Sequence, residues 1–354
     1  MLTVTLVATF AAAALWQQWR AVEVETAERA RMQAAWVLVG AIDWSRLILM
    51  EDGRGGGANT TDNLGEPWAI PLEEARLTSF LAADKNVASD ALDGLPDAFL
   101  SGRIVDAQSK LNVRNLVEVG KPVEGPVAAF TKLFAMLGLP PQELSAMVAG
   151  LQRAVPAPAA IVNPATAGAT GATGTAGTTT VPVIGGVLTS PSSTSSTPAA
   201  PSTPMDAVPA ADAPLMPQQV SQLVWLGVSS ATATALEPYV TILPVRTPVN
   251  INTAGPEVLY ASMPKLDMAG AQKIVSLRAR GAFTQLGQMT DAVANAQIVD
   301  GQQSISTDYF EIYGKLRLDR TWVEERSLVR RNGLEVTMLW RERGTGTTLP
   351  TPRP

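Results

Sequence analysis

The sequence predicts an α+β fold in which a long N-terminal helix packs on a small antiparallel sheet and a large helical domain interrupts the chain between them. Three observations predict it. Residues 2–50 contain no proline and repeat apolar residues three or four positions apart. Residues 309–340 alternate apolar and polar residues, which is the period of a strand. Between these segments, residues 127–153 and 255–280 carry helix start and stop signals.

The N-terminal helix is the first predicted element. Met1–Trp19 contains no charged residue, and the apolar spacing continues through Arg20–Met50 until the glycine cluster that begins at Gly53. A helix of about 50 residues is about 75 Å long, whereas the average globular helix has about 11–12 residues. A long helix with an apolar tip is typical of a chain that is anchored in a membrane at one end and packed on a partner at the other.

Residues 1–19 are predicted to be the transmembrane part of this helix. The alternative is a cleaved secretory signal with Ala11–Ala14 as its small-residue site, but no basic segment precedes the apolar run. Met1–Trp16 would span about 24 Å of a hydrocarbon core about 30 Å thick, so the apolar segment is about four residues short at its front. The predicted anchoring side chains are Leu2, Val4, Leu6, Val7, Phe10 and Leu15.

Further along, the same helix carries an apolar face that we expect to pack against the helices of partner proteins. Its residues recur at helical spacing. They are Ala27, Ala34, Leu38, Ala41 and Ile48.

Residues 20–111 are predicted to combine this helix, to about residue 50, with a loop and short strands. A glycine-rich loop leads to Asp62–Trp68, which we interpret as a turn entering a strand. Arg103–Asp106 and Lys110–Val113 alternate apolar and polar residues around Ala107–Ser109, which predicts a β-hairpin.

Residues 112–248 are predicted to form a first helical unit. Helical character is expected from residue 116, with one helix over Val127–Leu137 closed by Gly138 and another that begins at Pro140-Pro141 and runs to Arg153. Two short helices, over Gln218–Leu226 and Ser229–Leu236, complete it, followed by an extended link over Tyr239–Leu243.

An insert at residues 154–215 interrupts this unit. Residues 154–205 contain no charged side chain and are mostly Ala, Thr, Ser, Pro and Gly. Such a segment cannot bury enough apolar surface to offset the entropy of ordering, so we expect it to be disordered. A glycosylated stalk is the alternative interpretation.

Residues 249–303 are predicted to form a second helical unit that resembles a helix-hairpin-helix. After Asn250–Ala254 come helices over Gly255–Met263 and Met268–Arg280, joined by the turn Pro264–Asp267. Because such units commonly bind DNA, the alternative function is a membrane-anchored DNA-binding protein of the competence type.

The turn of this unit argues against DNA binding. A hairpin that holds a phosphate needs glycines for close approach and nearby cations, but Pro264–Asp267 has no glycine. Asp267 would repel a phosphate, and we expect it to cap the second helix instead. The structural interpretation, a helical module used for packing, is therefore favoured.

Residues 304–343 predict a three-stranded antiparallel meander. Its strands are expected over Tyr309–Leu318, Val323–Val329 and Leu334–Trp340. Asn332-Gly333 is a strong signal for a type I′ turn between the last two. Residues 344–354, rich in Gly, Thr and Pro, are expected to form a disordered tail.

Composition excludes several function classes. The 354-residue chain has no cysteine and no histidine, which excludes disulfides, thiolate nucleophiles, Cys/His zinc sites and imidazole catalysis. No nucleophile–base pair is visible, so we do not expect an enzyme. The formal net charge of −5 argues against nucleic acid as the main partner.

Taken together, these segments resemble one family, the type II secretion system minor pseudopilin K, also called general secretion pathway protein K. Each segment is a weak signal alone, but their order and spacing cover nearly the whole chain outside residues 154–215. The segments are Gln33–Trp36, Ala41–Leu49, Leu64–Ala69, Gly102–Gln108, Leu111–Leu116, Asn250–Ala254 with its hairpin, Tyr309–Ile312 and Leu339–Arg341.

The resemblance implies a pilin-like fold interrupted by an α-domain of two SAM-like units. It implies a single-pass protein of the bacterial inner membrane, with most of the chain in the periplasm. It also implies assembly with the minor pseudopilins I and J at the tip of the pseudopilus, on the inner-membrane platform of the system, for protein export across the outer membrane.

Two features of the family bear on particular residues. Some members bind calcium, for which Asp291, Asp300, Asp308 and Glu311 offer oxygen ligands, although no spacing distinguishes them from solvated carboxylates. Family precursors begin with a basic leader that ends in glycine, and this chain shows neither. The short apolar segment is therefore interpreted as a missing front.

Overall fold

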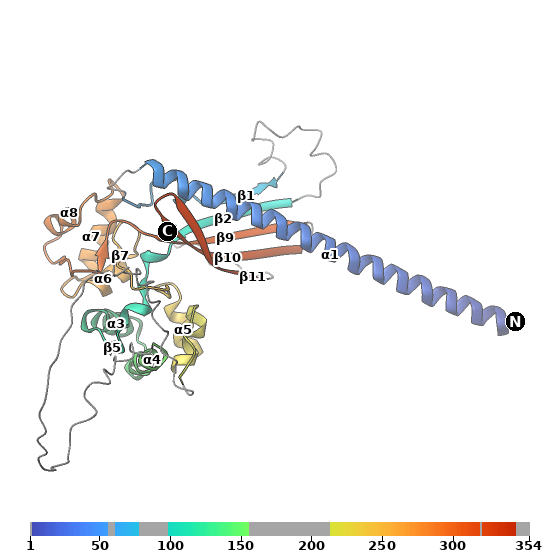
Figure 1. The fold of residues 1–354 in the computed structure, drawn as a ribbon, viewed down its shortest axis with the longest axis horizontal. Helices are drawn as coiled ribbons and strands as arrows, with labels where there is room; N and C mark the ends of the chain where they lie inside the picture. The colour runs from blue at the N-terminus through green and yellow to red at the C-terminus, as the bar shows by residue number, and fades with distance from the viewer. Residues whose placement is uncertain (1, 56–60, 78–97, 156–212, 319–320, 345–354) are drawn as a thin grey trace, which may run out of the picture.

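The computed structural model describes residues 2–55, 61–77, 98–155, 213–318 and 321–344, and Figure 1 shows their arrangement. The first helix, α1 (Leu2–Gly55), runs unbroken for 54 residues. Its N-terminal part projects away from the body, and its C-terminal part lies along a sheet. The long N-terminal helix is therefore confirmed, and it continues five residues beyond the predicted end.

The sheet has five strands, all antiparallel, in the order β1-β2-β9-β10-β11. The predicted meander accounts for its last three strands, and the two strands added at its other side precede the helical domain in the chain. The bounds are β1 (Leu72–Arg76), β2 (Ala98–Asp106), β9 (Tyr309–Leu318), β10 (Thr321–Asn332) and β11 (Glu335–Gly344).

One face of this sheet is covered by α1. Ala34, Leu38, Ile42 and Leu49 lie on one side of the helix and are buried. They pack in two clusters with strand residues such as Phe310 and Leu316. The short 3-10 helix η2 (Pro67–Ala69) closes one end of this layer, where the Trp68 ring meets Phe310 edge to face at 5.1 Å.

The predicted hairpin around Ala107–Ser109 is wrong. Residues 98–106 form one long strand that pairs with β1 and β9. The carboxylate of Asp106 accepts a hydrogen bond from the backbone N–H of Gln108, which starts a 3-10 turn, η4 (Ala107–Ser109). This turn directs the chain out of the sheet, and β3 (Leu111–Asn112) pairs in parallel with β6 (Val240–Thr241) instead.

The predicted turn at Asn332-Gly333 is shifted by one residue. Asn332 pairs with Glu335, so the two-residue loop is Gly333-Leu334. Gly333 has a φ of 60°, while Leu334 is not among the described residues with positive φ. Positive φ at the first loop residue alone is the pattern of a type II′ turn, not the predicted type I′.

The helical domain has one core, to which helices from both segments predicted as units contribute. The first unit holds α3 (Glu124–Leu137), α4 (Pro141–Ala154), η7 (Val220–Leu226) and α5 (Ser230–Leu236), and the second holds α6 (Pro256–Ser262), α7 (Met268–Arg278) and α8 (Leu286–Ala292). Buried residues from both units belong to a single hydrophobic cluster, in which α3 packs against α6. Their classification as SAM-like units stays a prediction.

Short elements connect these helices to the sheet. The helix expected from residue 116 begins only at Glu124, because η5 (Val113–Leu116) and the small hairpin of β4 (Val117–Glu118) and β5 (Lys121–Pro122) precede it. Two more strands, β7 (Val249–Asn250) and β8 (Gln303–Ser304), pair in parallel at the base of the second unit. Nearly all of the predicted insert, 156–212, and of the predicted tail, 345–354, lies outside the described residues.

Candidate functional site

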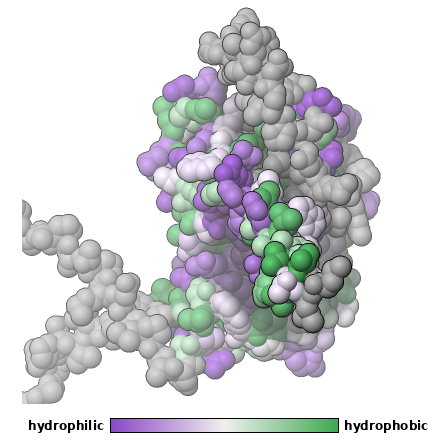
Figure 2. Space-filling view, turned by 90° about the vertical axis from the view of Figure 1, so that its right-hand side faces the viewer, coloured by the Kyte–Doolittle hydropathy of each residue, from purple (hydrophilic) through white to green (hydrophobic). Residues whose placement is uncertain are grey.

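The predicted anchor residues lie on the freely projecting part of α1. Val4, Leu6, Val7, Phe10 and Leu15 expose between 54% and 70% of their surface. The side chain of Leu2 lies outside the described residues. Figure 2 views the molecule from the side on which α1 projects, and hydrophobic residues gather in one patch of that face. Large apolar side chains so exposed indicate a surface that water does not normally contact.

By length and composition, the described residues include one helix that can cross a membrane, Thr3–Gly55. Of the window that meets this criterion 22% is buried, and the buried part lies beyond Gln33, because every described side chain from Thr3 to Gln33 is exposed. Trp16 and Trp19 follow the apolar run and are also exposed, and the guanidinium of Arg20 lies 4.9 Å from the Trp16 ring centre. Tryptophan and arginine at the end of an apolar helix are typical of a membrane–water interface.

The structure distributes the five predicted partner-packing residues over three environments. Ala34 and Leu38 are buried against the chain's own sheet. Ala41 and Ile48 are partly buried at the edge of this core, and Ala27 is exposed. Packing of this face against a partner stays a prediction, and its two buried members already contact β2 and β9 side chains within the chain.

The turn between α6 and α7, which the sequence predicts to be a helix-hairpin-helix turn, is capped at one helix and occupied by a lysine side chain. As predicted, the Asp267 carboxylate caps α7 by accepting a hydrogen bond of 2.7 Å from the backbone N–H of Gly270. From the other unit, the Lys132 ammonium reaches into the turn and donates to the carbonyl oxygens of Tyr260 at 2.6 Å and Met263 at 2.7 Å. Weaker contacts of 3.3 and 3.2 Å go to the carbonyls of Pro264 and Leu266.

A second cationic side chain of this unit also binds backbone carbonyls of the same chain. Arg278 on α7 donates to the carbonyl oxygens of Ile251 and Ala254 at 2.7 and 2.6 Å, which fixes the loop before α6. Burial lowers the pKa of Arg278 to about 10, because the charged form loses hydration without gaining a carboxylate. Lys132 and Arg278 are bound to backbone carbonyls, so these two cations are not available to a phosphate even though Lys265 is exposed in the turn, and this disfavours the DNA-binding alternative.

A buried junction joins the sheet to this unit. The Asp106 carboxylate at the end of β2 accepts hydrogen bonds from Asn250 Nδ2 at 2.9 Å and Thr253 Oγ1 at 2.5 Å. Burial raises the pKa of Asp106 to about 6, and the hydrogen bonds oppose this shift. Asn250 and Thr253 belong to the segment that sequence reasoning singled out as a motif, and here they position domains instead of binding a ligand.

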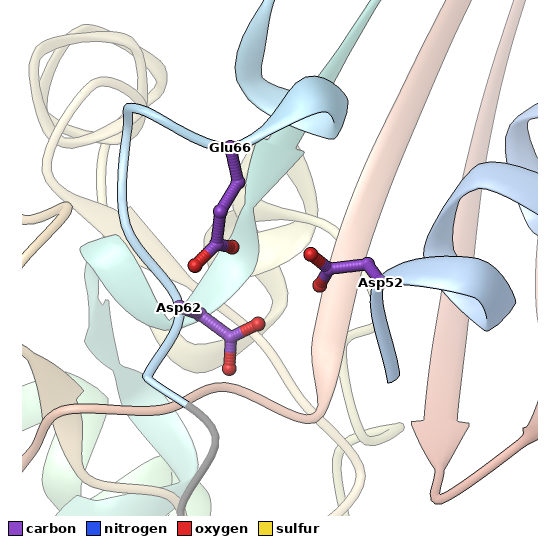
Figure 3. Close-up of side chains that lie close together, drawn as sticks. All are labelled: Asp52, Asp62 and Glu66. Atoms are coloured by element: carbon purple, nitrogen blue, oxygen red, sulfur yellow. The ribbon is translucent and has the colours of Figure 1, made fainter. Parts of the chain in front are cut away.

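An acidic cluster lies where α1 ends, and Figure 3 shows its three carboxylates pointing toward one another. They are Asp52, Asp62 and Glu66, whose ligand-type atoms all lie within 4.8 Å of one another. The guanidinium of Arg331 on β10 pairs with Asp52 at 2.5 Å and with Asp62. Glu66 accepts from Trp68 Nε1 at 2.5 Å and from Asn63 Nδ2 at 2.6 Å.

Two carboxylates of this cluster, Asp52 and Asp62, are already paired with a cation, the Arg331 side chain. Burial, followed by the charges of Asp52 and Asp62, raises the pKa of Glu66 to about 7. Sequence reasoning missed the cluster because its three carboxylates follow no recognised ligand spacing, and Arg331, which pairs with two of them, is 269 residues from Asp62.

The four carboxylates named as calcium candidates do not come together among the described residues. Asp291, Asp300 and Asp308 are exposed. Glu311 is buried in the sheet, where it accepts from Arg326 at 2.9 Å and from Tyr313 Oη at 2.5 Å. Nearby Lys110 and Arg326 outweigh its burial and lower the pKa of Glu311. Its oxygens are therefore committed to partners inside the fold.

Comparisons with known proteins point in one direction. The family model described as "Type II secretion system (T2SS), protein K" matches residues 249–308. Over 343 residues, 28% are identical to the "Type II secretion system protein K" of Pseudomonas aeruginosa strain PAO1, covering 92% of this chain and 85% of that protein.

The fold resembles a chain of a solved structure. That structure is entitled "The Crystal Structure of the GspK-GspI-GspJ complex from enterotoxigenic Escherichia coli Type 2 Secretion System". The match has a TM-score of 0.57 at 16% identity and covers 90% of this chain and 99% of that one. It supports the arrangement of the long helix, the antiparallel sheet and the inserted helical domain.

Proposed function

We propose that this chain, a member of the type II secretion system protein K family, is a minor pseudopilin whose work is assembly in protein export across the outer membrane. It would sit in the bacterial inner membrane as a single-pass protein, with α1 as its anchor and the remainder of the chain in the periplasm. The observation that carries the proposal is the arrangement of α1: the stretch up to Trp19 is uncharged and its described side chains are exposed, while the C-terminal part packs on the sheet.

The proposed role in assembly is supported by the exposed surface of the N-terminal part of α1. From Thr3 to Gln33 the described side chains of α1 are all exposed, so this part of the helix is not packed into the chain's own core. Because most of the stability of a helix in a protein comes from packing of its apolar face, lipid and neighbouring helices would supply the contacts that this part of α1 lacks. The solved structure similar to this fold is titled as a complex of K, I and J proteins. We therefore propose minor pseudopilins I and J as the partners.

A position at the tip of the pseudopilus is supported by the place of the helical domain. Figure 1 shows this domain at the end of the sheet farther from the N-terminus of α1. If α1 rises from the membrane, the helical domain lies at the membrane-distal end. A subunit stacked above it would collide with this domain, so the chain would end a filament and would not continue one.

The proposal is tested by expressing the chain with the I and J pseudopilins of the same secretion system. We expect the chain in the inner-membrane fraction, a detergent-stable complex with one copy of each subunit, and loss of cargo secretion when the chain is deleted. Long filaments of the purified chain alone would contradict the tip position. A soluble chain that copurifies with neither subunit would contradict the proposed function as a whole.

A further inference from the structure

We propose that the partner helix crosses α1 at Gly40, between the indole rings of Trp36 and Trp44. The occupant we infer is the membrane-anchored N-terminal helix of a partner pseudopilin. This inference rests on the proposed function and specifies which face of α1 makes the contact. The face consists of Met32, Trp36, Gly40, Trp44 and Ile48, and we call it the tryptophan row.

The tryptophan row follows from helix geometry. Residues four positions apart form one ridge on a helix surface, and such ridges are what neighbouring helices pack against. Trp36 is 75% exposed, Met32 58% and Trp44 45%, although the opposite side of the helix, with Leu38 and Ile42, is buried. The chain's own sheet therefore uses one side of α1 and leaves an apolar, aromatic ridge on another.

Gly40 interrupts this ridge. A Cβ atom built at Gly40 meets no atom of the described residues within 4 Å, so no contact in this part of the chain requires a glycine there. Glycine also weakens a helix interior relative to other residues. Its missing side chain leaves a notch in the ridge, and the Cα atoms of Trp36 and Trp44 lie about 6 Å away along the axis, one turn to either side. Such a notch lets the backbone of a second helix approach closely.

The C-terminal part of the tryptophan row borders a cavity of about 270 Å³. Its walls include Ala41, Trp44 and Ile48 from α1 and Ile70 from the segment before β1. Ile70 is itself 69% exposed. This volume is enough for one large side chain of the crossing helix, so Ala41 and Ile48, two of the residues predicted to pack on a partner, would contact it at this point.

The small area of the tryptophan row indicates which kind of partner can bind it. Met32 to Ile48 covers about 24 Å of helix, and a helix is about 10 Å wide, so the row offers roughly 240 Å². A stable interface between soluble proteins buries about 800 Å² on each partner, about three times as much. A helix anchored in the same membrane has a high effective concentration and can bind a small surface. It would also run in the same direction as α1.

The test fills the notch without disturbing the fold. Gly40→Leu adds a side chain where the chain has open space and raises helix propensity, so the thermal midpoint of the variant should equal or exceed the wild-type value. Its copurification with the I and J pseudopilins should fall at least tenfold. Gly287→Leu is the matched control, because Gly287 is another exposed helical glycine with no atom within 4 Å of a built Cβ, and its assembly should be unchanged.

Crosslinking identifies the occupant. Because the chain has no cysteine, Trp36→Cys introduces a single thiol, which should crosslink to a cysteine placed in the partner's anchor helix. Leu38→Cys, buried against the sheet, should not. A crosslink between two copies of this chain would overturn the assignment in favour of a homodimer face. If wild type and Gly40→Leu assemble equally with the I and J pseudopilins, the proposed crossing at Gly40 is wrong, and the proposed function is unaffected. If the wild-type chain does not assemble with these pseudopilins, both the crossing at Gly40 and the proposed function are wrong.

Discussion

The ammonium of Lys132 lies 2.7 Å from the carbonyl oxygen of Met263, although the two residues are 131 positions apart. This hydrogen bond connects α3 of the first helical unit to the turn of the second. The same ammonium lies 4.1 Å from the centre of the Tyr260 ring. A motif that holds an external phosphate in other proteins is here completed by a side chain of the same protein, which joins the two units into one domain.

Lys132→Met should therefore destabilise the helical domain. The substitution keeps the apolar stem but removes the donor for the carbonyls of Tyr260 and Met263, and unsatisfied buried acceptors cost about 1–3 kcal/mol. The urea midpoint of unfolding, followed by circular dichroism, should fall accordingly. Lys265→Met, at an exposed lysine of the same turn, is the control and should leave the midpoint unchanged. Equal midpoints for both variants would contradict this role of Lys132.

Val7→Asp should prevent stable membrane insertion. Val7 is 66% exposed in the apolar part of α1, and an aspartate near the bilayer centre costs about 2.5–3.5 kcal/mol. We expect the variant to leave the membrane fraction and to lose secretion activity. Val24→Asp provides the control, since Val24 is exposed on the same helix but beyond the apolar run, and its fractionation should match wild type. Unchanged fractionation of Val7→Asp would show that the anchor lies elsewhere.

Gly333→Val should destabilise the sheet, whereas Asn332→Val should be tolerated. Gly333 has a φ of 60°, which a β-branched residue adopts at a cost of about 1–3 kcal/mol. Asn332 lies in β10 with ordinary strand geometry, where valine is favoured. Thermal melting monitored by tryptophan fluorescence distinguishes the two. Strong destabilisation by Asn332→Val would instead support the type I′ turn predicted from the sequence.

The acidic cluster should make the part of the chain formed by α1 and the sheet less stable as pH rises. The pKa of Glu66 is raised to about 7, so the folded state holds a proton that the unfolded state loses near its usual pKa of 4.5. Between these two values the folded state binds more protons, and the free energy of unfolding therefore falls as pH rises. We expect lower stability at pH 7.5 than at pH 5 from urea titrations, and a flatter pH profile in Glu66→Gln. Glu74→Gln, at an exposed ion pair with Arg317, should keep the wild-type slope.

The sequence predicts local elements well where a short pattern determines them. The spacing of Leu38, Ile42 and Leu49 defines the buried side of α1, and Gly138 ends α3 with a φ of 66°. Asp267 is recognisable as a cap because a capping residue acts on backbone groups only three positions away. These signals are contained within a few residues, so they do not depend on the remainder of the fold.

The errors and omissions arise where distant residues decide the structure. Ala107–Ser109 reads as a hairpin turn, but pairing of β2 with β9 and the side chain of Asp106 redirect the chain. The Asp52–Arg331 and Lys132–Met263 contacts join segments 279 and 131 residues apart, and no local pattern records them. The sequence likewise does not show which face of α1 is open to a partner, because this depends on which face the sheet covers.

The unbroken course of α1 has a mechanical consequence. Over 54 residues the helix is about 80 Å long and has no proline that would act as a joint between the bilayer and the sheet. It therefore behaves as a lever, in which a tilt of about 10° at the membrane carries the far end sideways by about 14 Å. Arg46 and the buried side chains attach the C-terminal part of α1 to the sheet. Any such tilt therefore moves the sheet and the helical domain together with the helix.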